Sequence, residues 1–185
     1  MNTETIPELI SKMLIALEGD VRQGTKETPA RVARAFDEMF DGYDTDITTL
    51  CKTFPEEGAD QLVVIRDIPF TSFCEHHMLP FQGVAHVAYL PNGRVIGASK
   101  IPRIVLAYAH RLQLQERIAE QVAKALTDHL NPMGVAVIIK ATHQCMQCRG
   151  VKSIGSSMVN SVMLGEFRDN PTLRQELLSL LSITK

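Results

Sequence analysis

The stretch QERIAEQVAKALTDHLNPMGVAVIIKATHQC, residues 115–145, changes its secondary-structure preference halfway along. Residues 115–130 consist mainly of good helix formers, and the turn-forming sequence Asn131-Pro132-Met133-Gly134 stops the predicted helix. Residues 135–145 are rich in β-branched side chains, which favour a strand. The stretch therefore predicts a helix that leads through a tight turn into a strand.

The flanking segments extend this pattern in both directions. Further strands are predicted at residues 61–70, 83–90 and 158–167, and further helices at 5–19, 28–42, 99–112 and 171–182. From residue 61 the order is strand, strand, helix, helix, strand, strand, followed by one helix. This order indicates an α+β fold, with two helices on one face of a four-stranded antiparallel sheet. An N-terminal helical hairpin precedes it, so we expect a helical region over 1–60 and a catalytic domain over 61–185.

Composition narrows the possible class of protein. With 185 residues, 45% hydrophobic and 22% charged, the chain is long enough for one domain with a real core. No apolar run has the length of a membrane span, and the N-terminus lacks the pattern of a secretory signal. We therefore expect a cytoplasmic protein without a membrane partner. The net charge of −2 argues against a nucleic-acid partner.

Cysteine and histidine gather in two short clusters. In a reducing compartment, cysteines more often bind metal or do chemistry than form disulfides. Within TSFCEHHMLPF, residues 71–81, Cys74 and His77 are three apart and can face one point, whereas His76 points elsewhere. If the strand from residue 135 continues, alternation brings His143 and Cys145 toward a common site. The two clusters together predict a metal site.

Two kinds of zinc site fit these residues. The closed alternative is a structural site with four protein ligands: Cys74, His77, Cys145 and Cys148. The open alternative uses three protein ligands and leaves one position for water, as in catalytic sites. The closed site would leave two titratable groups, His76 and His143, beside the metal without a role. The residues alone leave both alternatives open.

A basic cluster predicts an anion site. Ser99-Lys-Ile-Pro-Arg103 opens a helix, and helix N-termini attract anions through their free N–H groups. Lys100 and Arg103 share one face of that helix, and Arg149 and Lys152 follow the second cysteine cluster. These side chains could hold a phosphate chain, or they could simply form a solvated face with Ser99 as N-cap.

Glu116 lies at the start of the helix predicted over 115–130. A carboxylate in this position stabilises the helix dipole. It could also accept two hydrogen bonds from the N1–H and the exocyclic amine of a guanine. Both interpretations fit the sequence.

Four separated motifs occur in one order: Cys74-Glu-His-His77, Val95-Ile-Gly-x-Ser-Lys100-Ile-x-Arg103, Leu114-Gln-Glu-Arg117 and His143-x-Cys145-x-x-x-Arg149-Gly150. On these motifs the chain strongly resembles the GTP cyclohydrolase I family. The resemblance runs from Thr28–Ala33 to the last helix, nearly the whole chain. Agreement of several motifs in order and spacing is more specific than any one of them.

The resemblance implies a T-fold and a homodecamer of two pentameric rings, with active sites between subunits. It implies hydrolysis of GTP to 7,8-dihydroneopterin triphosphate and formate. This is the first step toward folate or tetrahydrobiopterin, and in some bacteria toward deazaguanine nucleosides.

The resemblance also assigns roles to individual residues. The zinc (Zn2+) ligands it implies are Cys74, His77 and Cys145, with an open position for the water that attacks guanine C8. The proton-transfer residues it implies are His76 and His143, the latter at N7, and Ser99 is placed near the ribose. The substrate contacts it implies are Gln115 and Glu116 for guanine, and Lys100, Arg103, Arg149 and Arg31 for triphosphate, with Arg31 from a neighbouring subunit.

Two residues depart from the family pattern. Cys148 occupies a position where the family does not require cysteine, and we expect it to be a bystander. Asn160 lies in a stretch where the family usually carries more threonines, and the sequence offers no physical account of it.

Three rival functions are compatible with some of these motifs. The first is a zinc-stabilised purine- or pterin-binding module without turnover, which the closed four-ligand site would support. The second is a sibling nitrile reductase, which uses a cysteine nucleophile and no zinc, so the intact ligand set argues against it. The third is a zinc nucleoside deaminase, whose H-x-E and P-C-x-x-C signature is absent here.

Overall fold

The computed structural model describes residues 5–182. They form an α+β protein, as the order of predicted elements indicated. The chain divides into two compact units, one ending at Asp41 and one beginning at Gly42, and each is described by itself. Among the described residues, no helix combines the length and the apolar character needed to span a bilayer.

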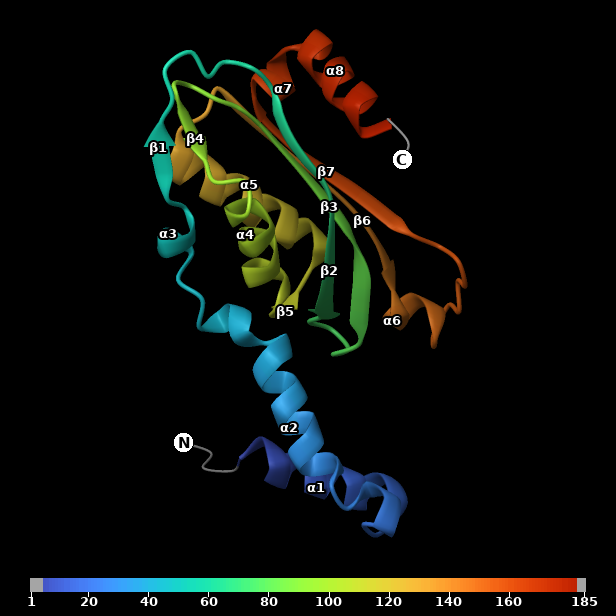
Figure 1. Cartoon of the computed structure of the whole chain (residues 1–185). Helices are drawn as coiled ribbons and strands as arrows, with labels where there is room; N and C mark the ends of the chain where they lie inside the picture. Colours follow the sequence, from blue (N-terminus) through green and yellow to red (C-terminus); the bar gives the residue numbers. More distant parts are fainter. Residues whose placement is uncertain (1–4, 183–185) are drawn as a thin grey trace. The chain divides into compact units, whose positions relative to one another are not determined.

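The N-terminal unit is helical. Its elements are α1 (Ile6–Glu18), the short 3-10 helix η1 (Gln23–Thr25) and α2 (Thr28–Met39) (Figure 1). The Glu8 carboxylate accepts the Thr5 N–H at the start of α1, and Gly19 ends the helix with φ 81°, a conformation that glycine adopts without strain. Pro29 occupies the first turn of α2, where no N–H donor is needed.

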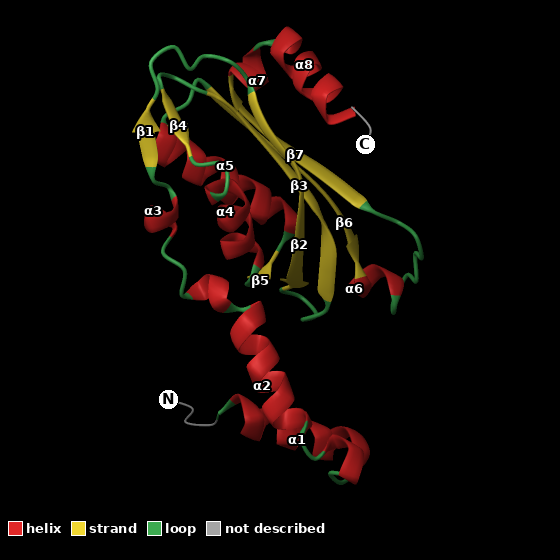
Figure 2. Ribbon diagram, in the orientation of Figure 1, coloured by secondary structure: helices red, strands yellow, loops and turns green. Residues whose placement is uncertain are grey.

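The second unit is built on a sheet with the strand order β5-β2-β3-β6-β7 (Figure 2). Its strands are β2 (Val63–Cys74), β3 (Pro80–Leu90), β5 (Leu112–Gln113), β6 (Gly134–His143) and β7 (Met158–Gly165). Strands β2, β3, β6 and β7 pair antiparallel with one another in this order, whereas β5 pairs parallel with the end of β2. The sequence did not predict β5, because two residues are too few to show an alternating pattern.

Shorter elements and helices surround the sheet. They are η2 (Asp41–Tyr43), α3 (Ile47–Leu50), β1 (Thr53–Pro55), β4 (Arg94–Ile96), α4 (Lys100–Ala109), α5 (Gln115–Leu130), α6 (Gln144–Gln147), α7 (Glu166–Asp169) and α8 (Pro171–Ser182). Strands β1 and β4 pair with each other in a separate two-stranded sheet.

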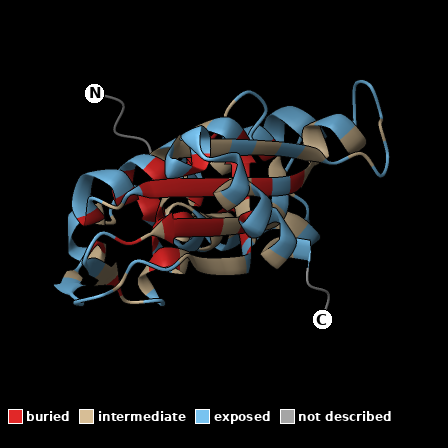
Figure 3. Cartoon of the chain, turned by 90° about the horizontal axis from the view of Figure 1, so that it is seen from above, coloured by how far each residue is buried: buried red, intermediate tan, exposed pale blue. Residues whose placement is uncertain are grey.

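The main core lies between α4, α5 and one face of the sheet. Ile104 of α4, Val122 of α5, and Val137 and Ile139 of β6 are all fully buried there. Figure 3 shows the buried residues concentrated on the central strands. Burying an aliphatic side chain stabilises a fold by about 1.5–3 kcal/mol, so this interface holds the helices on the sheet. Alternate residues of β6 enter this core, as predicted.

The opposite face of the sheet is also partly covered. Phe167 of α7 and Leu177 of α8 pack with Ala88 of β3 and Ala136 of β6. The small alanines leave room for the two larger side chains. The fold therefore has helices on both faces, and not only the two that the sequence predicted on one face.

Two strand ends differ from prediction near the cysteine clusters. β2 was predicted to end at residue 70, but its pairing with β3 continues until Phe73 faces Pro80. β6 was predicted to continue through Cys145, but it ends at His143 and the chain turns into α6. The expectation that Cys145 lies on the face of β6 is therefore wrong. A helical turn, not strand alternation, orients its side chain.

Candidate active site

Three predicted metal ligands come together where β2 ends. Cys74 is the last residue of β2, and His77 lies in the turn that follows. The turn wraps around the Cys74 carbonyl, which accepts the N–H groups of His77 and Met78 at 3.2 and 2.8 Å. Cys145 reaches the same place from α6, because the β3–β6 pairing sets His143 opposite Phe81 at this end of the sheet.

The geometry of this group suits a metal ion. One donor atom from each of Cys74, His77 and Cys145 lies within 4.8 Å of the other two, and Cys74 Sγ is 3.9 Å from His77 Nδ1. Zinc bonds of about 2.0–2.3 Å place neighbouring ligand atoms about 3.3–3.8 Å apart in a tetrahedron. Small side-chain rotations would close this difference. Two thiols and one imidazole are also a donor set that zinc prefers.

The electrostatics of the two neighbouring cysteines also favour a bound cation. Burial raises the pKa of the Cys145 thiol, and the neighbouring Cys74 sulfur raises that pKa further. Two thiolates side by side are therefore unfavourable unless a cation balances them. The Arg149 guanidinium lies beside the cluster, with its Nη1 3.2 Å from His77 Nε2.

Cys148 lies outside the cluster. It is exposed and follows the last residue of α6, and the group of mutually close donors among the described residues contains only the other three ligands. A closed four-ligand site would need this thiol beside Cys145 and Cys74. The observed arrangement favours three protein ligands with one open position.

His76 lies at the edge of the cluster. Its Nδ1 is 3.9 Å from Cys74 Sγ, and its ring meets the His77 ring edge to face at 6.3 Å between centroids. The side chain is exposed, so a bound molecule can reach it.

His143 is held more firmly. Its ring stacks on Phe81, with 4.5 Å between centroids and 7° between planes, and its Nε2 lies 2.9 Å from Gln115 Oε1. Burial lowers the pKa of His143, and the nearby Glu116 carboxylate partly opposes that shift. The imidazole is thus favoured in its neutral form in a fixed orientation. Sequence reasoning missed Phe81, because a buried aromatic in a strand gives no functional signal.

Gln115 and Glu116 are neighbours in sequence but differ in environment. Glu116 is exposed, whereas Gln115 is 1% exposed and its side chain enters the core. Besides His143, the Gln115 amide contacts three acceptors from its Nε2: the carbonyls of Ile139 and Met158 at 3.1 and 3.2 Å, and Asn160 Oδ1 at 2.7 Å. The structure brings both predicted guanine contacts close to His143, but only Glu116 faces outward.

The turn carrying the ligands is tied to α5 by an ion pair that the sequence analysis did not identify. Arg117 donates from Nη1 and Nη2 to the two carboxylate oxygens of Glu75, at 2.5 and 3.1 Å. This contact holds the pKa of Glu75 below its usual value. Both residues lie inside the family motifs, but their pairing depends on tertiary structure.

The predicted ribose contact and two of the predicted phosphate contacts lie at the start of α4. Ser99 is the N-cap of α4 without a side-chain capping bond, and Lys100 and Arg103 lie in the first turn. α4 runs toward β5, whose Gln113 pairs with Cys74. Its 10 residues span about 15 Å, and its last turn, not its first, leads into the strand beside the cluster. Arg149 alone among these cations lies at the cluster.

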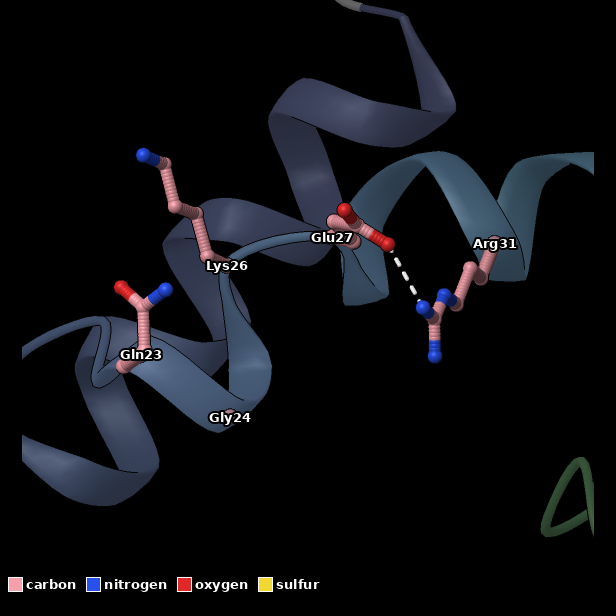
Figure 4. Close-up of a pocket in the computed structure, with 5 residues that line it drawn as sticks. All are labelled: Gln23, Gly24, Lys26, Glu27 and Arg31. Carbon is pink, nitrogen blue, oxygen red and sulfur yellow. Dashed lines mark hydrogen bonds and ion pairs between the residues drawn. The ribbon is translucent and has the colours of Figure 1, made fainter.

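Arg31 lies on α2 in the N-terminal unit. Figure 4 shows it beside a shallow pocket that Gln23, Gly24, Lys26 and Glu27 also line. Its Nη2 contacts Glu27 Oε2 at 2.6 Å across one helical turn, and both side chains are exposed. Exposed pairs of this kind are weak, so the guanidinium remains able to bind another anion.

Comparison with known proteins identifies relatives along the whole chain. The family model described as GTP cyclohydrolase I matches residues 6–182. The GTP cyclohydrolase 1 of Dehalococcoides mccartyi is 46% identical over 181 residues, which is 96% of each chain. The enzyme of the same name from Thermoanaerobacter pseudethanolicus is 44% identical over 187 residues, covering 100% of both. That of Leptospira biflexa is 49% identical over 161 residues, covering 86% of this chain and 88% of the relative.

Solved structures give a weaker likeness. An archaeosine synthase QueF-Like in the apo form aligns with a TM-score of 0.46 and 20% identity over 60% of this chain and 97% of its own. Dihydroneopterin aldolase from E. coli, in complex with neopterin, aligns with a TM-score of 0.44 and 15% identity over 57% of this chain and 99% of its own.

Proposed function

This chain belongs to the GTP cyclohydrolase I family and is an enzyme of that activity, and we propose which of its residues carry each part of the reaction. The substrate is GTP. The guanine imidazole ring is opened by hydrolysis at C8, formate leaves, and the ribose rearranges and closes to give 7,8-dihydroneopterin triphosphate. The observation that carries the proposal is the cluster of Cys74, His77 and Cys145 in a chain that matches the family over residues 6–182.

Zinc is the ion that we propose for this cluster. Cys74, His77 and Cys145 would hold it, and the ion would supply a Lewis acid able to activate water near neutral pH. The turn around the Cys74 carbonyl orients two of these ligands, and α6 orients the third.

His143 is the proposed proton carrier at guanine N7. Its stacking on Phe81 and its contact with Gln115 hold the ring in place, which general acid–base catalysis requires. His76, exposed at the rim, is the proposed second carrier, during ring opening and formate release. The two proposed proton carriers thus differ in setting: His143 is half-buried and held by its neighbours, whereas His76 is exposed.

Glu116 is the proposed guanine-selecting residue. It is exposed next to the buried Gln115, close enough to His143 to influence its pKa. A carboxylate there accepts the N1–H and the exocyclic amine of guanine, a donor pair that adenine lacks. A base without these donors would leave the carboxylate unpaired, so the site should select strongly for guanine over adenine.

Arg149 is proposed to hold the triphosphate from the same chain as the metal cluster, because it contacts His77. The ribose contact and the remaining triphosphate contacts are proposed to come from other subunits. Ser99, Lys100 and Arg103 lie at the start of α4, roughly 15 Å along the helix from the end that leads into β5 beside the cluster. A neighbouring copy could bring its own α4 start, and a further copy its Arg31, against the cluster. This separation supports active sites between subunits. The assembly we propose for them is the T-fold homodecamer of two pentameric rings that the family resemblance implies.

The product would feed folate, tetrahydrobiopterin or deazaguanine synthesis. A cytoplasmic location is proposed because the four free cysteines suit a reducing compartment.

The test is incubation of the purified protein with GTP, with and without a chelator. Formate release and the fluorescence of the oxidised pterin are followed together. Both products should form, and the chelator should abolish both. If neither forms while zinc stays bound, the rival function of a binding module is correct instead.

A further inference from the structure

A chain of three polar side chains crosses from β7 to the proposed proton carrier. Asn160 Oδ1 lies 2.7 Å from Gln115 Nε2, and Gln115 Oε1 lies 2.9 Å from His143 Nε2. The middle member is the first residue of α5, and its side chain is 1% exposed. The contacts link a helix and two strands that the sequence separates widely.

The backbone fixes which way the Gln115 amide points. The two ends of an amide look alike, so its orientation must be deduced from its partners. Backbone carbonyls can only accept hydrogen bonds, and those of Ile139 and Met158 both lie at the Nε2 end, at 3.1 and 3.2 Å. This end must therefore be the NH2 group. Asn160 then has to present its carbonyl oxygen there, and Gln115 has to present Oε1 to His143.

This orientation determines the hydrogen on His143. An amide oxygen can only accept, so the ring nitrogen facing it must be the donor. The neutral imidazole therefore carries its hydrogen on Nε2, and Nδ1 has the free lone pair. Stacking on the buried Phe81 prevents the ring from tilting away from this contact.

We propose that Asn160 and Gln115 are positioning residues, which fix the orientation and tautomer of His143 so that Nδ1 is the nitrogen that meets the substrate. The inference rests on the proposed function of His143 as proton carrier. It also changes the role of Gln115, whose amide is occupied inside the protein and does not contact guanine. The guanine edge is then left to Glu116.

The inference gives Asn160 a physical role. Its position in β7 is opposite Ile139 in β6, directly beside the buried amide. The asparagine oxygen lies one bond further from the backbone than a threonine hydroxyl at the same position. Asparagine can thus reach the amide from the sheet without moving the strand.

Steady-state kinetics with GTP tests the roles. Asn160→Leu keeps a similar volume but removes the acceptor, so kcat should fall about 10-fold with KM nearly unchanged. Asn160→Asp keeps an acceptor and should recover most of that loss. Ser161→Ala, on the exposed neighbouring position of β7, is the matched control and should behave as the wild type. If Gln115→Leu raises KM and leaves kcat unchanged, Gln115 binds substrate and the inference is wrong.

Nitrogen NMR of the zinc-loaded protein, labelled with 15N-histidine, tests the geometry without turnover. The His143 signals, assigned with His143→Gln, should show hydrogen on Nε2 in the wild type and a mixture of tautomers in Asn160→Leu. Hydrogen on Nδ1 in the wild type would overturn the inference. A wild type that makes no formate would refute the proposed function instead, and the NMR result would still decide the geometry.

Discussion

Glu75 and Arg117 form a two-bond ion pair that joins the metal-ligand turn to the first turn of α5. Glu75 lies between Cys74 and His76, and Arg117 follows Glu116 directly. One contact thus sets the spacing between the metal cluster and the proposed guanine-selecting carboxylate. Only arginine offers two parallel N–H donors to a carboxylate.

Replacing Arg117 by lysine should weaken zinc binding and lower kcat, each by about 10-fold, because a lysine cannot keep both bonds. Zinc affinity is measured by competition with a chromophoric chelator. Lys124→Gln is the control, since it also removes a cation from α5 but breaks only an exposed pair with Asp128. Unchanged zinc affinity in Arg117→Lys would show that the ion pair does not position the ligands.

Cys148→Ser should retain one zinc per chain and near-normal activity, because the exposed thiol lies outside the ligand cluster. Cys145→Ser should lose both. Metal analysis after gel filtration gives the stoichiometry of each variant. Release of zinc from Cys148→Ser would restore the closed four-ligand site as the better interpretation.

Ser99→Ala should separate the two halves of the reaction. The side chain is exposed and makes no capping bond, so its loss should leave the fold intact. Formate release should continue, whereas the pterin product should form more slowly because the ribose step loses its hydroxyl. The two products are measured in one assay, and an equal loss of both would contradict a role confined to the ribose.

His86 should make stability depend on pH. Its Nδ1 accepts the N–H of Asp67, a residue with φ 58° at the irregularity in the pairing of β2. Burial lowers the pKa of the imidazole below 6.5. The Asp67 carboxylate opposes this shift and the Arg66 guanidinium adds to it. Because the folded pKa is depressed, the contribution is complete above pH 6.5 and is lost as pH falls through the folded pKa.

Urea unfolding at pH 7.5 and pH 5 measures this loss. The variant His86→Asn keeps a side-chain acceptor without a titrating group, so its stability should change less between the two pH values than that of the wild type. An equal change in both proteins would exclude His86 as the source.

Hydrophobic periodicity predicted the α+β class, because it is a local property of the chain. Ligand spacing predicted a metal site but left Cys148 open as a fourth ligand, and only the family resemblance implied the three-ligand set. The sequence could not predict how Cys145 reaches the cluster, since the turn into α6 depends on where β6 pairing ends. It also could not predict that Gln115 is buried beside Asn160. That contact depends on the register of β6 with β7 and on the docking of α5, neither of which leaves a local pattern.

The distance between the start of α4 and the metal cluster of the same chain has a genetic consequence. Each catalytic centre would then take its metal cluster from one copy and its phosphate-binding residues from another. A substitution in the cluster of one chain and a substitution at the α4 start of a second chain need not fall in the same centre. Co-expressed Cys145→Ser and Arg103→Ala chains, each inactive alone, should form mixed rings in which some centres contain only intact parts. These mixed assemblies should recover part of the activity. A mixture of the two separately purified variants, whose subunits have not exchanged, should stay inactive. Two broken alleles of this gene would then complement each other.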